Sequence, residues 1–193
     1  MAQTTKPLTF VLVHGVWHGG WCWSRVADKL RERGHRVTTP THTGLGERSH
    51  LLSPAITMDT FVEDIVAHLM WEDLKDVVLV GHSFGGAPIS GAADRIPERI
   101  KRLIYLDAAV MEDGETWFGL LPPETAAARK EAAQEVTGGL SLPVGPVESF
   151  GVENPSDVAF LEGRLTPHPL ATFSTPLRLK GPCGNGLPAH YIT

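Results

Sequence analysis

The feature that most constrains the fold is a tight, glycine-bounded turn between an apolar run and a helical segment. Val77–Val80 is typical of a strand buried on both faces, and it leads directly into Gly81-His82-Ser83-Phe84-Gly85. The residues from Phe84 to about Arg95 predict a helix that ends before Pro97. A turn this tight leaves almost no room for a side chain two residues before and two residues after the serine, and glycine occupies both positions. The pattern therefore predicts that Ser83 projects above the end of a sheet.

The rest of the first half of the chain alternates between strand-like and helix-like segments. The predicted strands are residues 8–13, 36–39 and 103–106, and the predicted helices are residues 23–33 and 59–70. This alternation predicts an α/β fold with a mainly parallel sheet flanked by helices.

After Asp107 the pattern changes. Residues 108–185 hold a large share of the prolines, and they predict two helices, one over 124–136 and one that begins at Asn154-Pro155. Residues 189–193 resemble the beginning of another strand. We therefore predict a core over residues 1–107, a helical cap over 108–185 and the start of a further core strand over 186–193.

The predicted turn points to nucleophilic chemistry at Ser83. A serine at a helix N-terminus lies where the helix dipole and free N–H groups favour developing negative charge. A tetrahedral intermediate needs two convergent backbone donors, and the N–H of Phe84 is one candidate. The loop His14–Gly20 follows the first strand, and the N–H of Val16 in that loop is the second candidate.

Three histidines lie close in sequence to these features. His14 is a candidate base, but in this position a histidine more often braces its loop through a hydrogen bond. We expect His82 to point away from Ser83 into the packing of the sheet. For His18 two alternatives stay open, because the side chain either lines the pocket or caps the glycine-rich loop.

Together the motifs carry a resemblance to a known family. They are His14-Gly15-x-x-His18-Gly19-Gly20-Trp21, Thr43-Gly44-x-Gly46-Glu47 and Gly81-His82-Ser83-x-Gly85-Gly86. This set resembles the α/β-hydrolase branch that contains plant methyl-ester esterases, salicylate-binding proteins, hydroxynitrile lyases and bacterial carboxylesterases. The resemblance implies an α/β-hydrolase fold with a helical cap, no metal and no cofactor. It also implies Ser83 as the nucleophile, with Val16 and Phe84 as oxyanion donors.

The acid and the base of a catalytic triad are harder to assign. In this fold the chain order is serine, then Asp or Glu, then histidine. Asp107 follows a strand and is an alternative acid, although a turn or capping role fits it better. His168 falls in the predicted cap and His190 in the last strand, so neither is placed as a base. We therefore expect the triad acid and histidine beyond residue 193, with C-terminal strands and helices missing.

The substrate class follows from the aromatic content. The chain has five tryptophans, and we expect Trp17 and Trp117, together with His18, to contact an apolar acyl or alcohol group of a small carboxylic ester. Cyanohydrin cleavage is an alternative that needs a cation near the serine, which the sequence does not place. A non-catalytic ligand-binding relative or an inactive truncated product is a third alternative.

Composition limits the partners. With 17 basic and 22 acidic residues, the net charge of −5 gives no basic surface for nucleic acid or an anionic membrane. Cys22 and Cys183 fit no metal or redox spacing and predict free thiols. With no signal-like or membrane-spanning run, we expect a soluble cytoplasmic protein, and oligomeric state stays open.

Overall fold

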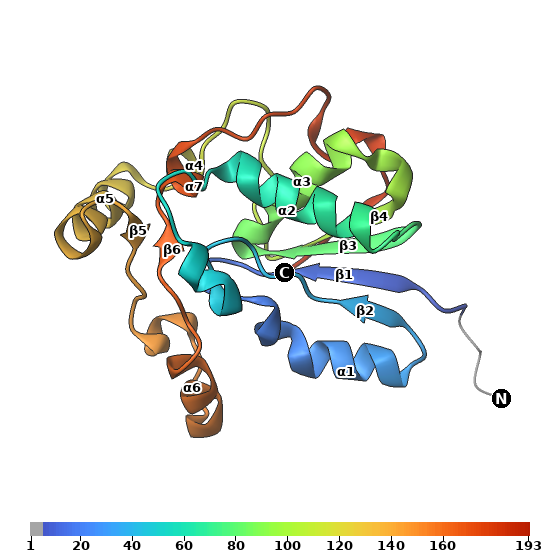
Figure 1. Cartoon of the computed structure of the whole chain (residues 1–193), viewed down its shortest axis with the longest axis horizontal. Helices are drawn as coiled ribbons and strands as arrows, with labels where there is room; N and C mark the ends of the chain where they lie inside the picture. The colour runs from blue at the N-terminus through green and yellow to red at the C-terminus, as the bar shows by residue number, and fades with distance from the viewer. Residues whose placement is uncertain (1–5) are drawn as a thin grey trace.

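Five parallel strands form the central sheet in the order β2-β1-β3-β4-β7 (Figure 1). The computed structural model describes residues 6–193. The strands are β1 Thr9–Val13, β2 Arg36–Thr38, β3 Val77–His82, β4 Ile100–Leu106 and β7 Ala189–Ile192. The sequence-based prediction of a mainly parallel α/β sheet is confirmed.

The strand order changes direction at β1, which lies between β2 and β3. In open α/β sheets, ligands bind beyond the carboxyl ends of the strands at such a switch point. The register pairs Val13 at the end of β1 with Gly81 near the end of β3. The loop after β1 and the turn after β3 therefore leave the sheet side by side.

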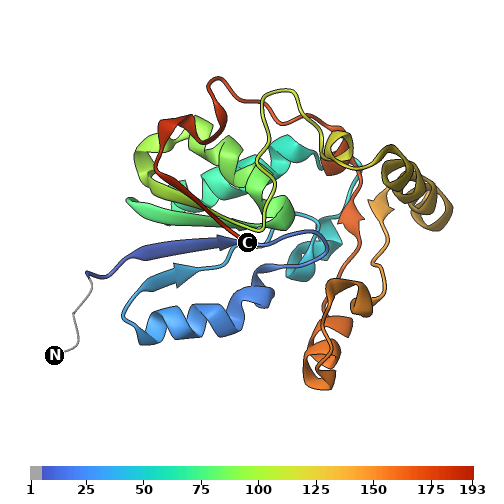
Figure 2. The same ribbon diagram turned by 180° about the vertical axis from the view of Figure 1, so that it is seen from behind.

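Strand β3 is buried on both faces, because helices cover the sheet on each side (Figures 1 and 2). Val77 and Leu79 pack with residues of α2 and α3 on one face. Val78 and Val80 pack with Ala27 of α1 on the other face. This alternation is the two-residue period of a strand, and it explains why the run is apolar throughout.

The three helices that flank the sheet are α1 Ser24–Glu32, α2 Met58–Trp71 and α3 Gly86–Arg95. Each lies within two residues of its predicted span. Thr57 and Thr60 form a capping box at the start of α2, which fixes where that helix begins. A short 3₁₀ segment, η1 Gly20–Trp23, precedes α1, and another, η3 Ser83–Gly85, joins β3 to α3.

Between β4 and β7 the chain forms a mainly helical region. Its elements are α4 Trp117–Leu120, α5 Pro123–Thr137, β5 Ser141–Leu142, η5 Val147–Phe150, α6 Pro155–Glu162, β6 His168–Pro169, α7 Ala171–Ser174 and η6 Cys183–Gly186. The two predicted helices are α5 and α6, and Asn154 caps α6 by accepting a hydrogen bond from the Ser156 N–H at 2.9 Å. The sequence did not predict the two-residue antiparallel pairing of β5 with β6.

The segment that precedes β7 returns to the core. The carboxylate of Asp94 on α3 accepts hydrogen bonds from the N–H groups of Lys180 and Gly181, and the Asn185 side chain donates to the carbonyl oxygen of Ala93. These contacts hold η6 against α3 and guide the chain into β7. The division into a core and a cap, with the boundaries given above, stays a prediction.

Two further observations concern the surface. All four residues of the edge strand β7 are exposed, including Tyr191 and Ile192. Among residues 6–193, no helix combines the length and the apolar character needed to cross a membrane.

We expect amide protons of α5 and α6 to exchange faster with solvent than those of β3 and β4. Helix α5 buries only Ala126 and Ala133, and α6 buries only Leu161, whereas β3 is buried along most of its length. Segments with few buried apolar contacts open at lower free energy. Hydrogen exchange followed by mass spectrometry checks this, and equal protection of the helices and the strands would contradict it.

Candidate active site

Ser83 lies at the turn between β3 and η3 with a φ of 53°, in the left-handed region that non-glycine residues rarely adopt. The two flanking glycines make this turn sterically feasible. A Cβ at residue 81 would lie 2.5 Å from the Gly85 carbonyl oxygen, and a Cβ at residue 85 would lie 2.8 Å from the His14 carbonyl oxygen. The predicted glycine-dependent turn is therefore present, and any side chain at either position would force it open.

The loop after β1 approaches the turn closely. A Cβ at residue 15 would lie only 3.1 Å from the Cβ of Ser83. His14 is fully buried and braces this loop, since its Nδ1–H donates to the Gly15 carbonyl oxygen at 2.8 Å and its Nε2 accepts from the His42 N–H at 3.1 Å. Both ring nitrogens are occupied, so the bracing interpretation of His14 holds and His14 is not available as a base.

A cavity of about 170 Å³ opens at Ser83. Five of the residues singled out from the sequence line it, namely Val16, Trp17, His18, Trp117 and Ser83 itself. Gly15, His82, Leu121, Arg129 and Phe150 complete the lining. The structure thus brings together, around one small cavity, residues that lie up to 135 positions apart in the chain (Gly15 to Phe150).

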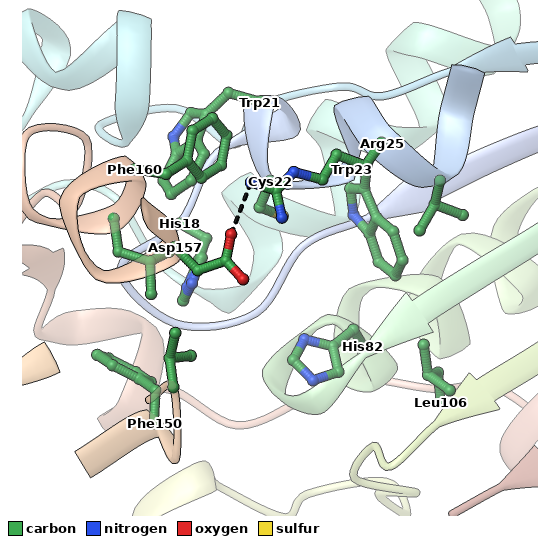
Figure 3. A pocket seen from close by; sticks show the side chains of 13 residues that line it. His18, Trp21, Cys22, Trp23, Arg25, His82, Leu106, Phe150, Asp157 and Phe160 are labelled. Atoms are coloured by element: carbon green, nitrogen blue, oxygen red, sulfur yellow. Dashed lines mark ion pairs between the residues drawn. The ribbon is translucent and has the colours of Figure 1, made fainter. Parts of the chain in front are cut away.

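A larger chamber of about 450 Å³ adjoins this cavity and shares His18, His82 and Phe150 with it (Figure 3). Aromatic rings dominate its walls, with Trp21 and Trp23 from η1 and Phe160 from α6. An ion pair between Arg25 and Asp157, at 2.7 Å, joins α1 to α6 beside the chamber. The smaller cavity contains Ser83, whereas the larger one offers apolar surface next to it.

The prediction for His82 is right only in part. Its ring packs edge-on against the buried Trp23 ring, with centroids 6.2 Å apart, but it also lines both cavities (Figure 3). The strand period explains this, because residue 82 shares a face with Val78 and Val80, and beyond Val80 that face is covered only loosely by η1 and α6. Desolvation, followed by nearby His18, lowers the pKa of His82, while Asp107 raises it.

His18 fulfils both of the alternatives left open by the sequence. Its Nδ1–H donates to the Val16 carbonyl oxygen at 2.7 Å, which braces the loop. The ring also lines both cavities and stacks on Trp21 with centroids 5.5 Å apart. Burial lowers the pKa of His18, so its ring is neutral near pH 7 and its Nε2 is an acceptor.

Phe84 and Asp107 occupy different surroundings from the cavity residues. The Phe84 ring is fully buried and packs against Trp117, His168 and Phe173, which anchors the residue that follows the serine. Asp107 is exposed, has a φ of 41°, and its N–H donates to the Ile192 carbonyl oxygen at 2.7 Å. No hydrogen bond joins its carboxylate to a histidine among residues 6–193, so the geometry fits the turn role.

Neither His168 nor His190 is hydrogen-bonded to Ser83. His168 is buried, where it accepts from the Trp17 N–H at 3.4 Å and bonds to the Thr172 hydroxyl at 3.0 Å. His190 is exposed on β7 beside Arg102. Within the described part of the chain, no histidine forms a hydrogen bond with the Ser83 hydroxyl.

The loop over residues 41–45 is more buried than its polar sequence suggests. Asp64 on α2 accepts hydrogen bonds from the N–H and the hydroxyl of Thr43, both at 2.7 Å, and from Arg48 at 3.2 Å. Burial opposes the shift, but the nearby ring of His42, followed by the two hydrogen bonds from Thr43, lowers the pKa of Asp64. The network holds His42 against His14 and so supports the loop beside Ser83.

Arg129 and Phe150 are two of the lining residues that the sequence did not predict. Arg129 on α5 and Phe150 at the end of η5 both reach the Ser83 cavity. Arg129 lies in an Ala-rich, charged helix whose sequence gives no sign that one cation faces inward.

Comparison with known proteins gives the family. The model of the alpha/beta hydrolase family matches residues 10–190. The chain belongs to the α/β-hydrolase family. A carbendazim-hydrolyzing esterase from Nocardioides sp. (strain SG-4G) is 46% identical over 181 residues, which are 89% of this chain and 74% of that protein.

Two further matches are a plant methylesterase and the solved structure of a bacterial α/β-hydrolase. Methylesterase 1 of Arabidopsis thaliana is 37% identical over 118 residues, and the match spans 60% of this chain but only 44% of the plant protein. Among solved structures, an extracellular α/β-hydrolase from a Paenibacillus species, described as homologous in structure and function to tobacco salicylic acid binding protein 2, superposes with a TM-score of 0.84 at 29% identity. That match covers 96% of this chain and 76% of the other. The predicted resemblance is therefore confirmed at the level of family and fold.

The buried histidines make the stability of this hydrolase pH-dependent. Desolvation lowers the pKa of His14, His42 and His168. The unfolded chain, with histidine pKa values near 6.5, then binds more protons than the folded chain below that pH. We expect the free energy of unfolding to be fully retained above about pH 6.5 and to fall as the pH drops from there, by about 1.4 kcal/mol per pH unit for each buried histidine.

Urea unfolding between pH 7.5 and 5.5 measures this slope. His168→Asn keeps an acceptor near the position of Nδ1 but does not titrate. It should therefore reduce the pH dependence of the free energy of unfolding by about 1.4 kcal/mol per pH unit, the contribution of one histidine. A free energy of unfolding that stays constant or rises on acidification would contradict the assignment.

Proposed function

We propose that this protein hydrolyses small carboxylic esters through an acyl-enzyme formed on Ser83. The observation that carries the proposal is the strained turn, which holds Ser83 at the base of a cavity on the switch point of the sheet. A left-handed serine between two sterically required glycines is costly, and such strain is concentrated at functional sites. The esterases named among the relatives support ester hydrolysis as the chemistry.

The backbone N–H groups of Val16 and Phe84 are the proposed oxyanion donors. Val16 lines the cavity with Ser83, and the loop that carries it passes within van der Waals distance of the serine. Phe84 follows Ser83 directly and leads into α3, whose N-terminus favours negative charge. Two such donors stabilise a tetrahedral intermediate in a site largely shielded from water.

The proposed reaction requires a base that the described residues do not supply in this arrangement. His18 and His82 are the histidines that share the cavity with Ser83, and neither forms a hydrogen bond with its hydroxyl. Proton transfer by a positioned base contributes about 10²–10⁴ to the rate, so this group determines how fast the ester is cleaved.

The larger chamber is the proposed site for the apolar part of the ester. Its walls are the rings of Trp21, Trp23, Phe150 and Phe160, and a flat or aromatic group is the best match for such walls (Figure 3).

Cyanohydrin cleavage stays the second candidate, because Arg129 now provides a cation in the Ser83 cavity. Release of cyanide from mandelonitrile tests it directly. Release that depends on both Ser83 and Arg129 would favour the lyase over the esterase.

Ser83 should be the residue that a fluorophosphonate modifies. Intact mass should rise by one adduct, peptide mapping should place it on Ser83, and Ser83→Ala should abolish it. In the enzyme, Ser83→Ala should lower hydrolysis of a 4-nitrophenyl ester by roughly 10⁴-fold or more. Ser174→Ala removes an exposed hydroxyl far from the motif in sequence and serves as the control, which should label normally. An adduct on another residue, or labelling that survives in Ser83→Ala, would overturn the proposal.

A further inference from the structure

Arg129 is a cation without a counter-ion beside the proposed nucleophile. It projects from α5 and lines the 170 Å³ cavity that contains Ser83. Its guanidinium forms neither a hydrogen bond nor an ion pair with any residue among 6–193, and none of the other lining residues is acidic. Among the described residues the guanidinium therefore has no ionic partner and is open to solvent or to a ligand.

Partial burial weakens the hydration of Arg129 without supplying an ionic partner. The residue is about half-buried, and desolvation lowers its pKa. Removing a charge from water without pairing it costs free energy, so unpaired cations are rarely kept inside apolar cavities. Arginine nevertheless stays protonated at physiological pH, so the cavity keeps its positive charge.

The Arg129 guanidinium contacts an aromatic ring whose position is fixed by hydrogen bonds. Its Cζ lies 5.8 Å from the centroid of the Trp17 ring, within the range of a cation–π contact. The Trp17 ring is itself fixed, because its Nε1–H donates to the Leu142 carbonyl oxygen at 3.2 Å and its backbone N–H donates to His168. This contact restricts where the guanidinium lies before any ligand arrives.

A second donor on the cavity wall also lacks an acceptor. Trp117 lines the same cavity, and its indole N–H is buried without a hydrogen-bond partner among residues 6–193. A buried donor left unsatisfied costs about 1–3 kcal/mol. This indole N–H is closed off from solvent, so Arg129 is the donor that the cavity offers to an acceptor group of a ligand.

We propose that Arg129 determines substrate specificity by binding a carboxylate of the ester substrate. This inference rests on the proposed ester hydrolysis at Ser83 and refines it. The substrate class is an ester that carries an aromatic or other apolar group for the larger chamber and a carboxylate beneath α5. The planar guanidinium presents two parallel N–H donors that match a carboxylate. The neutral rings of His18 and His82 add no competing positive charge near pH 7.

Binding of a carboxylate tests this role independently of the chemistry at Ser83. In Ser83→Ala protein, calorimetry compares phenylacetate with phenylacetamide, a neutral molecule of the same shape. We expect phenylacetate to bind at least about tenfold more tightly, because a charge-assisted, bidentate pair replaces a neutral contact. Adding Arg129→Met should abolish this preference, whereas Arg129→Lys should retain part of it.

Lys130→Met is the matched control. Lys130 is the next residue on α5, is exposed, and lies over the Phe118 ring instead of the Ser83 cavity. Its replacement removes one positive charge from the same helix and should leave the preference for phenylacetate unchanged. Equal binding of the acid and the amide, no binding of either, or a preference that survives in Arg129→Met would each overturn the proposal. All of these binding measurements use protein without the Ser83 hydroxyl. They therefore test the role of Arg129 separately from the role of Ser83, which fluorophosphonate labelling tests.

Discussion

The close approach between the loop after β1 and the turn after β3 is the contact on which the candidate site depends. A side chain at residue 15, 81 or 85 would collide with Ser83 or with backbone atoms of the two segments. The register that pairs Val13 with Gly81 brings the segments together, and the left-handed conformation of Ser83 then aims its side chain at the cavity. The proposed oxyanion hole depends on this spacing, because it requires the N–H groups of Val16 and Phe84 to face the same point.

Neutral, buried histidines keep this contact in place. His14 bonds to its own loop and to the backbone of residue 42, and His168 bonds to the backbone of Trp17. Neutral imidazole suits these positions because it offers one donor and one acceptor without the desolvation cost of a charge. Protonation of these buried histidines would therefore change the geometry of the site.

The part of the site that local steric constraints determine could be predicted from the sequence. The part that depends on packing between distant segments could not. Gly81, Ser83 and Gly85 were predictable because the turn itself demands them. The cavity-lining edge of His82 was missed because it depends on how η1 and α6 cover one end of the sheet. Arg129 was missed because only the folded position of α5 distinguishes it from its solvent-exposed neighbour Lys130. The buried loop over residues 41–45 depends on Asp64, which lies some twenty residues further along the chain.

The most direct test of the account is a crystal structure of the protein with a methylphosphonate attached to Ser83. The phosphoryl oxygen of that adduct stands in for the oxyanion of the tetrahedral intermediate. We predict that this oxygen lies about 3 Å from the backbone nitrogens of both Val16 and Phe84, with the phosphorus in the cavity that Trp17, His18 and Trp117 line. A phosphoryl oxygen that points into solvent, or that contacts neither nitrogen, would contradict the central claim that the two loops converge to stabilise negative charge at Ser83.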